Sequence, residues 1–407
     1  MSRLGDEVRA VEAAHVLQVY RRLPVVLVRG KGCRVVDDDG REYLDLLSGI
    51  GVASLGHAHA GLAQAIADQA GELLHTSNLY FHPLQGEVAR RRARLSGLAR
   101  TFFCNSGTEA VEACLKFARR YWHARGETDR TGIVAFDGSF HGRTFGSLSV
   151  TSGAAYRTPF QPLVPDVRFV SPRDAAALEA AVTERTAAVI VEPIQGEGGV
   201  RPIPPATAAA LADRCAATGT LLIADEVQCG LGRTGRAFYS ATLGLAPDLM
   251  ALGKALGAGV PVGAALLGER VAEAVAFGDH GSTYGGNLLA CRAASVFLDA
   301  LEGGLIERVA AAGVRLRAGL EALAEASAAV GEVRGDGLMW GIDVTADVAD
   351  RVVATALERG LLINRTAGTV VRLLPPLTIG DADIDEALER LRQALADAAG
   401  ATSEPAP

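Results

Sequence analysis

Seven short apolar segments, separated by stretches with helical periodicity, constrain the fold of this chain more than any other feature. Continuous apolar runs of this length are typical of strands buried on both faces. They cover Phe102–Cys104, Ile133–Phe136, Val167–Val170, Val189–Val191, Leu221–Ala224, Leu249–Leu252 and Val262–Leu267. Helical stretches lie between several of them, at Glu109–His123, Ala175–Glu184 and Pro205–Thr218. The alternation predicts an α/β fold in which a mostly parallel, seven-stranded sheet is covered by helices on both faces.

The segments on either side of this region have a different rhythm. Near the start, two strand candidates at Pro24–Arg29 and Cys33–Asp37 precede a turn and a third strand at Glu42–Leu46, which predicts a small antiparallel unit. After about residue 290 the pattern predicts long helices at 290–328, strands near 331–343, 361–364 and 370–374, and helices at 347–359 and 381–398. We expect a large domain over 61–290 and a smaller α/β domain in which 1–60 joins 291–407, with a frayed tail at Ala401–Pro407.

Composition and charge exclude several classes of protein. The 40 basic and 47 acidic residues of the 407-residue chain are spread along it and give a net charge of −7, which argues against a nucleic-acid-binding surface. No apolar run approaches the roughly 18 residues of a membrane span, and Met1–Glu12 has no apolar core of a secretion signal. Six scattered cysteines without a CxxC pair are typical of reduced thiols, so we expect a cytoplasmic protein without a metal site.

Polar residues at the ends of the predicted strands are the first candidates for a site, because ligands of open parallel sheets bind at the carboxyl ends of the strands. The strand Phe102–Cys104 leads into the motif NSGTE at 105–109 and then into a helix. Ser106 and Glu109 have the spacing of a capping box. Gly107 permits a tight turn, and the free N–H groups of the first helical turn can bind a phosphate. An ordinary capped helix is the alternative explanation of this motif.

An acid ends another predicted strand, where the motif DEVQ occupies residues 225–228. A buried carboxylate is costly without a partner, so Asp225 needs a backbone donor, an arginine or a protonated ring nitrogen of a cofactor. A lysine, Lys254, follows the next strand among small and apolar residues. Desolvation lowers the pKa of such a lysine, and the neutral amine is the form that attacks a carbonyl. A surface lysine that extends into solvent is the alternative.

Three more groups follow other strands. In the motif FHGRT at 140–144, Phe140 can stack on a ring and Arg143 can clamp a carboxylate, while His141 between them is expected to be structural. The motif EPIQGEGG at 192–199 offers acids on a loop, and Arg372 is a second candidate carboxylate clamp. Taken together, a phosphate cradle, a stacking aromatic, a strand-end aspartate, an unusual lysine and two arginines suit a phosphorylated aromatic aldehyde, a description that fits pyridoxal phosphate.

Over nearly its whole length the chain resembles the class III aminotransferases of fold-type I. The motifs that carry the resemblance follow in order from LPVVLVRGKGCRVVDDDGREYLDLLSGI through LGHAHA, LLHTSNLY, NSGTEA, FHGRT, EPIQGEGG, DEVQCGLGRTG, GKALGAGVPVGA and HGSTYGGN to RLLPPLTI. So many motifs in one order are highly specific. The resemblance implies pyridoxal 5'-phosphate as the cofactor and an obligate homodimer with two shared active sites.

The resemblance also implies roles for individual residues. Lys254 matches the lysine that forms the covalent link to the cofactor and then carries a proton between substrate and cofactor. Asp225 matches the acid that pairs with the pyridine nitrogen, so that the ring can accept electrons. Further cofactor contacts are implied for Gly107, Thr108, Phe140, Glu226, Val227, Gln228 and, from the other subunit, Thr283.

For the substrate, the resemblance implies transfer of the terminal amine of N2-acetyl-L-ornithine to 2-oxoglutarate, as in arginine biosynthesis. Arg143 and Ser282 would hold the distal carboxylate of this amino donor. Glutamate carries a second carboxylate, for which Arg372 is suited. Glu197 matches a switch acid that pairs with Arg372 when the first donor is bound, because a buried arginine without a partner is costly.

Other activities remain open on the sequence. Ile50 stands where ornithine aminotransferases carry tyrosine, which disfavours free ornithine, and GSTYGGN at 281–287 is absent from typical 4-aminobutyrate enzymes. Succinyl-diaminopimelate is an alternative amino donor because it shares the distal carboxylate and the acylated amine. An aminomutase of glutamate semialdehyde would not need a switch between two donors. A non-catalytic relative is disfavoured because Lys254 and Asp225 are both retained.

Overall fold

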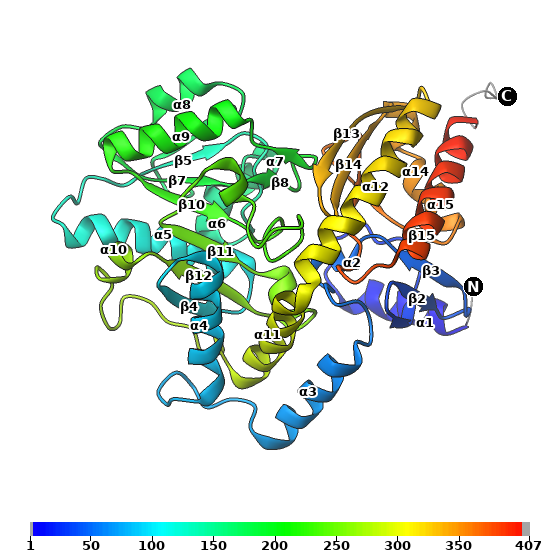
Figure 1. The fold of residues 1–407 in the computed structure, drawn as a ribbon, viewed down its shortest axis with the longest axis horizontal. Helices are drawn as coiled ribbons and strands as arrows, with labels where there is room; N and C mark the ends of the chain where they lie inside the picture. Colours follow the sequence, from blue (N-terminus) through cyan, green and yellow to red (C-terminus); the bar gives the residue numbers. More distant parts are fainter. Residues whose placement is uncertain (1–2, 401–407) are drawn as a thin grey trace.

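The computed structural model describes residues 3–400. Its largest sheet has seven strands and lies at the centre of the larger of two parts (Figure 1). All neighbouring strands are parallel except β12, which runs antiparallel to both β11 and β4. In spatial order the strands are β4 (Arg100–Cys104), β12 (Gly263–Leu267), β11 (Leu249–Leu252), β10 (Leu221–Asp225), β7 (Thr186–Val191), β5 (Gly132–Phe136) and β6 (Val167–Val170). The predicted α/β class and mostly parallel sheet are confirmed.

Several strands extend beyond the apolar runs that predicted them. β4 begins at Arg100 because its polar first residues pair with β12, Arg100 lying opposite Leu267. β10 includes Asp225, which lies opposite Ala251 of β11. Backbone pairing with a neighbour continues through polar residues, so hydropathy alone underestimates strand length.

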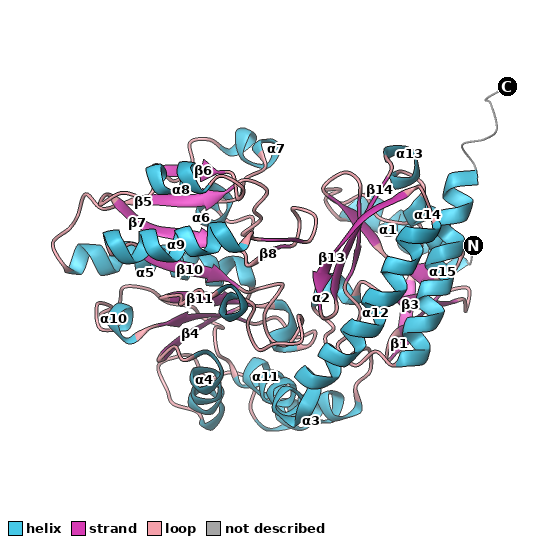
Figure 2. Ribbon diagram, turned by 45° about the horizontal axis from the view of Figure 1, so that its top comes forward, coloured by secondary structure: helices cyan, strands magenta, loops and turns pink. Residues whose placement is uncertain are grey.

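Successive residues of the strands pack against two separate helical layers. In β5, Ile133 packs in one cluster with α5 (Gly107–Ala124). The next residue, Val134, packs in another cluster with α8 (Ala175–Ala181) and α9 (Pro205–Thr218). Neighbouring side chains of a strand point to opposite faces, so helices cover both sides of the sheet, as predicted (Figure 2).

Further helical segments lie between these elements and near the N-terminus. They are α1 (Arg3–His15), α2 (Ser48–Gly51), α3 (Ala60–Glu72), α4 (Pro83–Ser96), α6 (Phe145–Ser149), α7 (Ala154–Arg157), η1 (Thr158–Phe160), η2 (Ser240–Leu243), η3 (Lys254–Gly257) and α10 (Glu269–Ala272). Within residues 3–400, no helix combines the length and apolar character needed to cross a bilayer.

Two four-stranded sheets are built from the chain ends. The first contains β1 (Leu27–Lys31), β2 (Arg34–Asp37), β3 (Glu42–Asp45) and β15 (Leu361–Leu362). The second contains β13 (Val330–Asp336), β14 (Met339–Val344), β17 (Val370–Leu373) and β16 (Asn364–Thr366), and β8 (Ile194–Gln195) pairs with β9 (Arg201–Pro202). β15 pairs with β3 in parallel, so N-terminal strands and a strand of the C-terminal part share one sheet. The proposed domain bounds stay a prediction.

Local breaks divide several predicted elements. The long helices expected over 290–328 are α11 (Leu288–Ala300) and α12 (Ile306–Ala326), which are separated by a π-helical turn η4 (Leu301–Leu305) that contains Gly303 and Gly304. The helix expected over 347–359 is divided into α13 (Ala346–Ala349) and α14 (Val352–Glu358), whereas α15 (Asp381–Gly400) is continuous. The strand region near 331–343 turns back at Gly337, whose φ is 54°. The tail predicted at Ala401–Pro407 lies outside the described residues.

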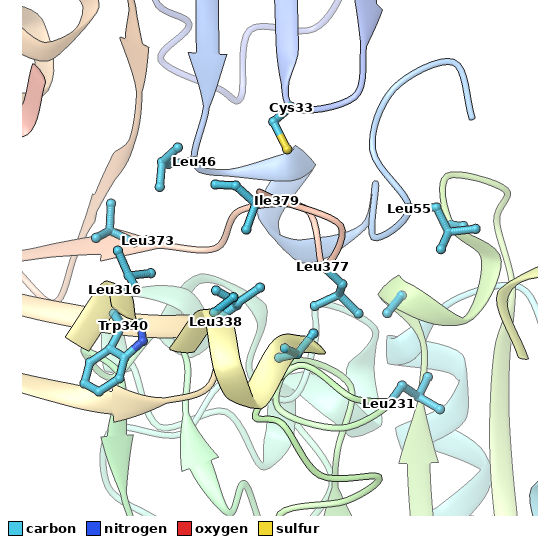
Figure 3. Packing of buried hydrophobic residues seen from close by; sticks show 14 of the residues in the cluster. Cys33, Leu46, Leu55, Leu231, Leu316, Leu338, Trp340, Leu373, Leu377 and Ile379 are labelled. Carbon is cyan, nitrogen blue, oxygen red and sulfur yellow. The ribbon is translucent and has the colours of Figure 1, made fainter. Parts of the chain in front are cut away.

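The largest hydrophobic cluster joins the two parts of the molecule (Figure 3). It combines residues from the N-terminal segment, the loops after β10, helix α12 and the C-terminal sheet, and Figure 3 labels ten of its members: Cys33, Leu46, Leu55, Leu231, Leu316, Leu338, Trp340, Leu373, Leu377 and Ile379. A shared apolar core of this kind fixes the small sheets against the strand ends of the large one.

All six cysteines are free and buried. Burial raises the pKa of the Cys33, Cys104, Cys215 and Cys291 thiols to about 12, and that of Cys114 and Cys229 well above the usual range. Thiols in this state are poor nucleophiles. Each of the four hydrophobic clusters contains at least one of them.

A buried arginine without a partner lies on α4. The three guanidinium nitrogens of Arg92 have no hydrogen-bond partner within residues 3–400, and the residue is 0% exposed. Desolvation lowers its pKa to about 10, and the nearest compensation is the ring of Phe103, 6.0 Å away. A desolvated charge without a partner destabilises the fold.

We therefore expect Arg92→Met, which keeps an unbranched side chain of similar length, to stabilise the protein by about 1 kcal/mol or more. The measurement is the thermal unfolding midpoint. The matched control is Arg91→Met on the same helix, which loses ion pairs of 3.0 Å with Glu302 and 2.9 Å with Asp299 and should not be stabilised. A larger loss of stability for Arg92→Met than for Arg91→Met would contradict the expectation.

Candidate active site

The carboxyl ends of β10 and β11 place the strand-end acid and the lysine at one edge of the sheet. Asp225 is the last residue of β10 and is 4% exposed, and Lys254 lies just beyond the end of the neighbouring β11. A Cβ on Gly253 would come within 3.0 Å of the Gly107 backbone, so the start of α5 lies directly against this edge. The three elements that the sequence predicted as site elements meet here.

Lys254 opens the short helix η3 with a left-handed backbone, its φ being 41°. Such a conformation is uncommon for a residue with a side chain and is found mostly at constrained sites. Desolvation lowers the pKa of the Lys254 amine, and the nearby carboxylates of Asp225, Glu197 and Glu192 counteract part of this effect. The lowered pKa increases the fraction of neutral amine, which is the form that takes up a proton or attacks a carbonyl.

Asp225 is held by its neighbours in one orientation. Its Oδ1 accepts the Val227 N–H at 3.1 Å, and its Oδ2 is 2.7 Å from His141 Nδ1. The other ring nitrogen of His141, Nε2, is buried without a partner among the described residues. The expectation that His141 is structural is therefore refined: it positions the acid, a contact across 84 residues that no local pattern could have predicted.

The start of α5 forms the expected cradle. Ser106 Oγ accepts the Glu109 N–H at 3.3 Å, while the Glu109 carboxylate bonds the N–H of Asn105 rather than that of Ser106, so the capping box is shifted by one residue. The N–H groups of the first turn have no partner within the helix. A Cβ on Gly107 would lie 2.7 Å from Val227, which shows how closely the DEVQ segment covers the turn. The Thr108 hydroxyl bonds Ser147 Oγ at 2.6 Å.

Glu192 is a buried carboxylate at this edge whose contacts the sequence did not reveal. It follows β7 directly, and its two carboxylate oxygens accept the N–H groups of Phe140 at 2.8 Å and Gly196 at 3.1 Å. Burial raises its pKa to about 7, His141 lowers it and Asp225 raises it further. One carboxylate thus fixes both the predicted ring-stacking residue and the loop that carries Glu197. The sequence signal that could have identified Glu192 is its position directly after a predicted strand.

Arg372 and Glu197 form an ion pair at the same edge. Arg372 lies on β17 and is wholly buried, with Nη1 2.5 Å from Glu197 Oε1 and 3.2 Å from Gln228 Oε1. Nε donates to Asn364 Oδ1 at 3.2 Å, whereas Nη2 is buried without a partner among residues 3–400. Burial raises the pKa of Glu197, but the guanidinium outweighs this effect and the net pKa is lowered. The pair is therefore charged at neutral pH.

Other predicted site residues have no side-chain hydrogen bond to Lys254 or Asp225 within residues 3–400. The Glu226 carboxylate accepts the Ser240 N–H at 2.6 Å and the Cys229 thiol at 3.1 Å, so its bonds are to the protein interior. Arg143 is exposed. Ser282 Oγ accepts the Gly285 N–H at 2.9 Å and Thr283 is exposed, and no hydrogen bond within the described chain joins either of them to Lys254.

The residues that meet at this edge fit pyridoxal phosphate. An amine of lowered pKa, a fixed carboxylate and a helix start closed by glycine suit its aldehyde, ring nitrogen and phosphate, respectively. Two buried nitrogens without partners, on His141 and Arg372, mark positions where further polar groups can bind. Within the described part of the chain, no group of three or more His, Cys, Asp or Glu residues is arranged to hold a metal ion.

Comparisons of sequence agree with this chemistry. The aminotransferase class-III family matches residues 16–395. The chain is 44% identical to the acetylornithine aminotransferase of Methanocaldococcus jannaschii, over 95% of this chain and 97% of the relative. It is 47% identical to the protein of the same name from Methanopyrus kandleri, over 93% and 96%.

Solved structures extend the similarity to the fold. The ornithine aminotransferase of Toxoplasma gondii matches with a TM-score of 0.93 at 34% identity, covering 98% of this chain and 96% of that one. The N-acetylornithine aminotransferase of Stenotrophomonas maltophilia matches with a TM-score of 0.83 at 36% identity, covering 96% and 99%.

The pKa of Glu192 predicts a pH dependence of stability. It is about 7 in the folded chain against an ordinary 4.5, so the folded state binds more protons between these values and stability falls as pH rises from about 4.5 to 7. Glu192→Gln removes this contribution. Its stability relative to the parent protein should therefore improve as pH rises, by at most about 3 kcal/mol over the window.

Thermal midpoints of both proteins at several pH values measure this effect. Glu184→Gln, at an exposed glutamate, serves as the control and should run parallel to the parent protein. A constant offset between Glu192→Gln and the parent protein across the window would rule out the assigned titration.

Proposed function

The chain belongs to the aminotransferase class-III family, and on this premise we propose that it transfers the terminal amino group of N2-acetyl-L-ornithine to 2-oxoglutarate. The products are N-acetyl-L-glutamate 5-semialdehyde and L-glutamate, and the reaction belongs to arginine biosynthesis. The cofactor is pyridoxal phosphate. Relatives named acetylornithine aminotransferase, 42–47% identical over most of the chain, support this choice of amino donor.

The ion pair of Arg372 with Glu197 is the observation that carries the proposal. Glutamate has two carboxylates and acetylornithine has one. An enzyme that uses both substrates needs a cation that is free to bind the second carboxylate of glutamate. The same cation must be paired with an acid of the protein when acetylornithine is bound. Arg372 is buried and paired with Glu197 at 2.5 Å, yet its Nη2 remains without a partner among the described residues. We propose that Glu197 moves aside when glutamate binds and returns for acetylornithine.

Bound pyridoxal phosphate supplies an aldehyde that carries the amino group and a ring that takes up electrons. Lys254 Nζ, with its lowered pKa, would accept a proton from the substrate carbon and deliver it to the cofactor. Asp225, oriented by His141, would hold the positive charge of the ring nitrogen. We assign the ring faces to Phe140 and Val227 and the phosphate to the turn of Gly107 and Thr108.

We also propose a homodimer with shared sites in the cytoplasm. Arg143 would bind the distal carboxylate together with Ser282, and Thr283 of the partner subunit would contact the phosphate. A dimer is supported by large apolar side chains that the single chain leaves in solvent, with Leu79 84% and Tyr80 70% exposed. Six buried free thiols are consistent with a reducing compartment.

The test is a comparison of amino donors on the purified enzyme with 2-oxoglutarate as acceptor. We expect kcat/KM for N2-acetyl-L-ornithine to exceed that for 4-aminobutyrate and L-ornithine at least about tenfold, with succinyl-diaminopimelate second. Lys254→Ala is the control and should show no turnover. The proposal fails if 4-aminobutyrate exceeds acetylornithine by an order of magnitude. Turnover without any keto acid would instead indicate an aminomutase.

Glu197→Ala tests the switch. The variant leaves the buried Arg372 charge with its weaker partners Gln228 and Asn364, so use of acetylornithine should fall about tenfold more than use of glutamate. Each half-reaction is followed separately by the spectral change of the cofactor. Glu197→Gln, which keeps a hydrogen-bond acceptor without the charge, should be intermediate. Equal losses in both half-reactions would eliminate the switch.

A further inference from the structure

Arg143 stacks on an aromatic side chain that has no assigned role. Its guanidinium carbon lies 3.7 Å from the ring centroid of Tyr156 in α7. The same guanidinium is 5.5 Å from the Phe140 ring, and the Phe140 and Tyr156 rings meet edge to face at 6.3 Å. The three side chains form one cluster that begins at Phe140, the predicted ring-stacking residue.

This contact leaves the hydrogen-bonding edge of Arg143 available. Stacking uses the face of the planar guanidinium, whereas its five N–H donors lie in the plane. Within residues 3–400 the guanidinium makes no hydrogen bond or ion pair, and the contact from Arg143 to Thr108 involves its backbone N–H. The side chain is thus oriented by a ring while its donors are free for a carboxylate.

Tyr156 is itself held in place. Its N–H donates to the Gly153 carbonyl at 3.0 Å, and a Cβ on Gly153 would lie 2.8 Å from the tyrosine ring, so glycine there permits the close approach of the ring. The adjoining Ser152 is tied to the Phe140 segment by two hydrogen bonds of 3.0 Å, one from Gly138 N–H to its Oγ and one from its N–H to the Ser139 carbonyl. These bonds hold the segment that carries Tyr156 against the Phe140 segment, and the ring contacts Gly153, Phe140 and Arg143.

We propose that Tyr156 is a positioning residue that orients Arg143 for the distal carboxylate of the amino donor, and so favours donors that carry this carboxylate. The inference rests on the proposed function, in which Arg143 is the carboxylate clamp. An exposed arginine that is not oriented loses side-chain freedom when it binds, and the Tyr156 ring reduces that loss in advance. The ring face, not the hydroxyl, provides the contact.

The test compares two amines that differ in one group. N-acetyl-1,4-diaminobutane is N2-acetyl-L-ornithine without its carboxylate. For Tyr156→Leu we expect kcat/KM with acetylornithine to fall about fivefold, mainly through KM, and that with N-acetyl-1,4-diaminobutane to change less than about twofold. Tyr156→Phe, which retains the ring, should restore the acetylornithine value. Single half-reactions are used, because 2-oxoglutarate also carries carboxylates.

Binding gives a second readout that does not depend on turnover. N-acetyl-L-norvaline, which keeps the carboxylate but lacks the reacting amine, should bind Tyr156→Leu holoenzyme about fivefold more weakly by calorimetry, and Tyr156→Phe normally. Phe169→Leu is the matched control, because it removes the ring 4.3 Å from the adjacent Arg157 and should leave both ligands unaffected.

Equal losses on both amines for Tyr156→Leu, or a Tyr156→Phe variant as impaired as Tyr156→Leu, would overturn the inference. The proposed function is tested separately by the parent enzyme. If the parent enzyme does not use acetylornithine, the proposed function fails, and norvaline binding still decides whether Tyr156 orients Arg143. If Tyr156→Leu does not fold, two other variants decide. The inference requires that Tyr156→Phe binds N-acetyl-L-norvaline normally and that Arg143→Lys binds it more weakly.

Discussion

The buried charge of Arg372 is the interaction on which the arrangement of the site depends. A guanidinium removed from water is strongly destabilising unless a carboxylate accompanies it, and Glu197 provides that carboxylate from a position 175 residues earlier in the chain. Arg372 lies on the C-terminal sheet, whereas Glu197 follows β7 of the seven-stranded sheet. The two sheets must therefore be packed together before the site has its full set of charges. The shared apolar core stabilises this packing, and the ion pair is one polar contact across it.

The buried acids at the strand ends differ in the hydrogen-bond donors that their carboxylates accept, and their roles differ accordingly. Asp225 receives a backbone N–H and faces His141, so it is fixed but retains the capacity to hold a positive ligand. Glu192 receives two backbone N–H groups and acts on the shape of two loops. Glu226, next to Asp225 in sequence, bonds the interior through Ser240 and Cys229. Hydrogen-bond partners, more than residue type, separate a chemical role from a structural one.

Local pattern was sufficient to predict the sheet and the chemical identity of its strand-end residues, because apolar runs and the groups that follow them lie next to each other in sequence. Asp225, Lys254 and Arg372 were singled out in this way, and the role of Glu197 as the partner of Arg372 was implied by resemblance. The bond of His141 to Asp225 and the two bonds of Glu192 depend on how distant loops meet, which periodicity does not encode. The burial of Arg92 likewise arises from tertiary packing, whereas the interruption at Gly303 and Gly304 follows the low helix preference of glycine.

The distribution of the cysteines gives the molecule built-in reporters of its own motion. A thiol buried with a raised pKa reacts with an alkylating reagent only when its surroundings open, so its rate of modification measures the free energy of that opening. Cys33 and Cys291 lie in the core shared by the two parts. Cys104 of β4 and Cys114 of α5 belong to the cluster on one face of the large sheet, and Cys215 of α9 belongs to the cluster on the other face. Cys229 lies in the smallest of the four clusters. Mass spectrometry of the alkylated native chain would thus measure the local opening around each cysteine without any introduced residue.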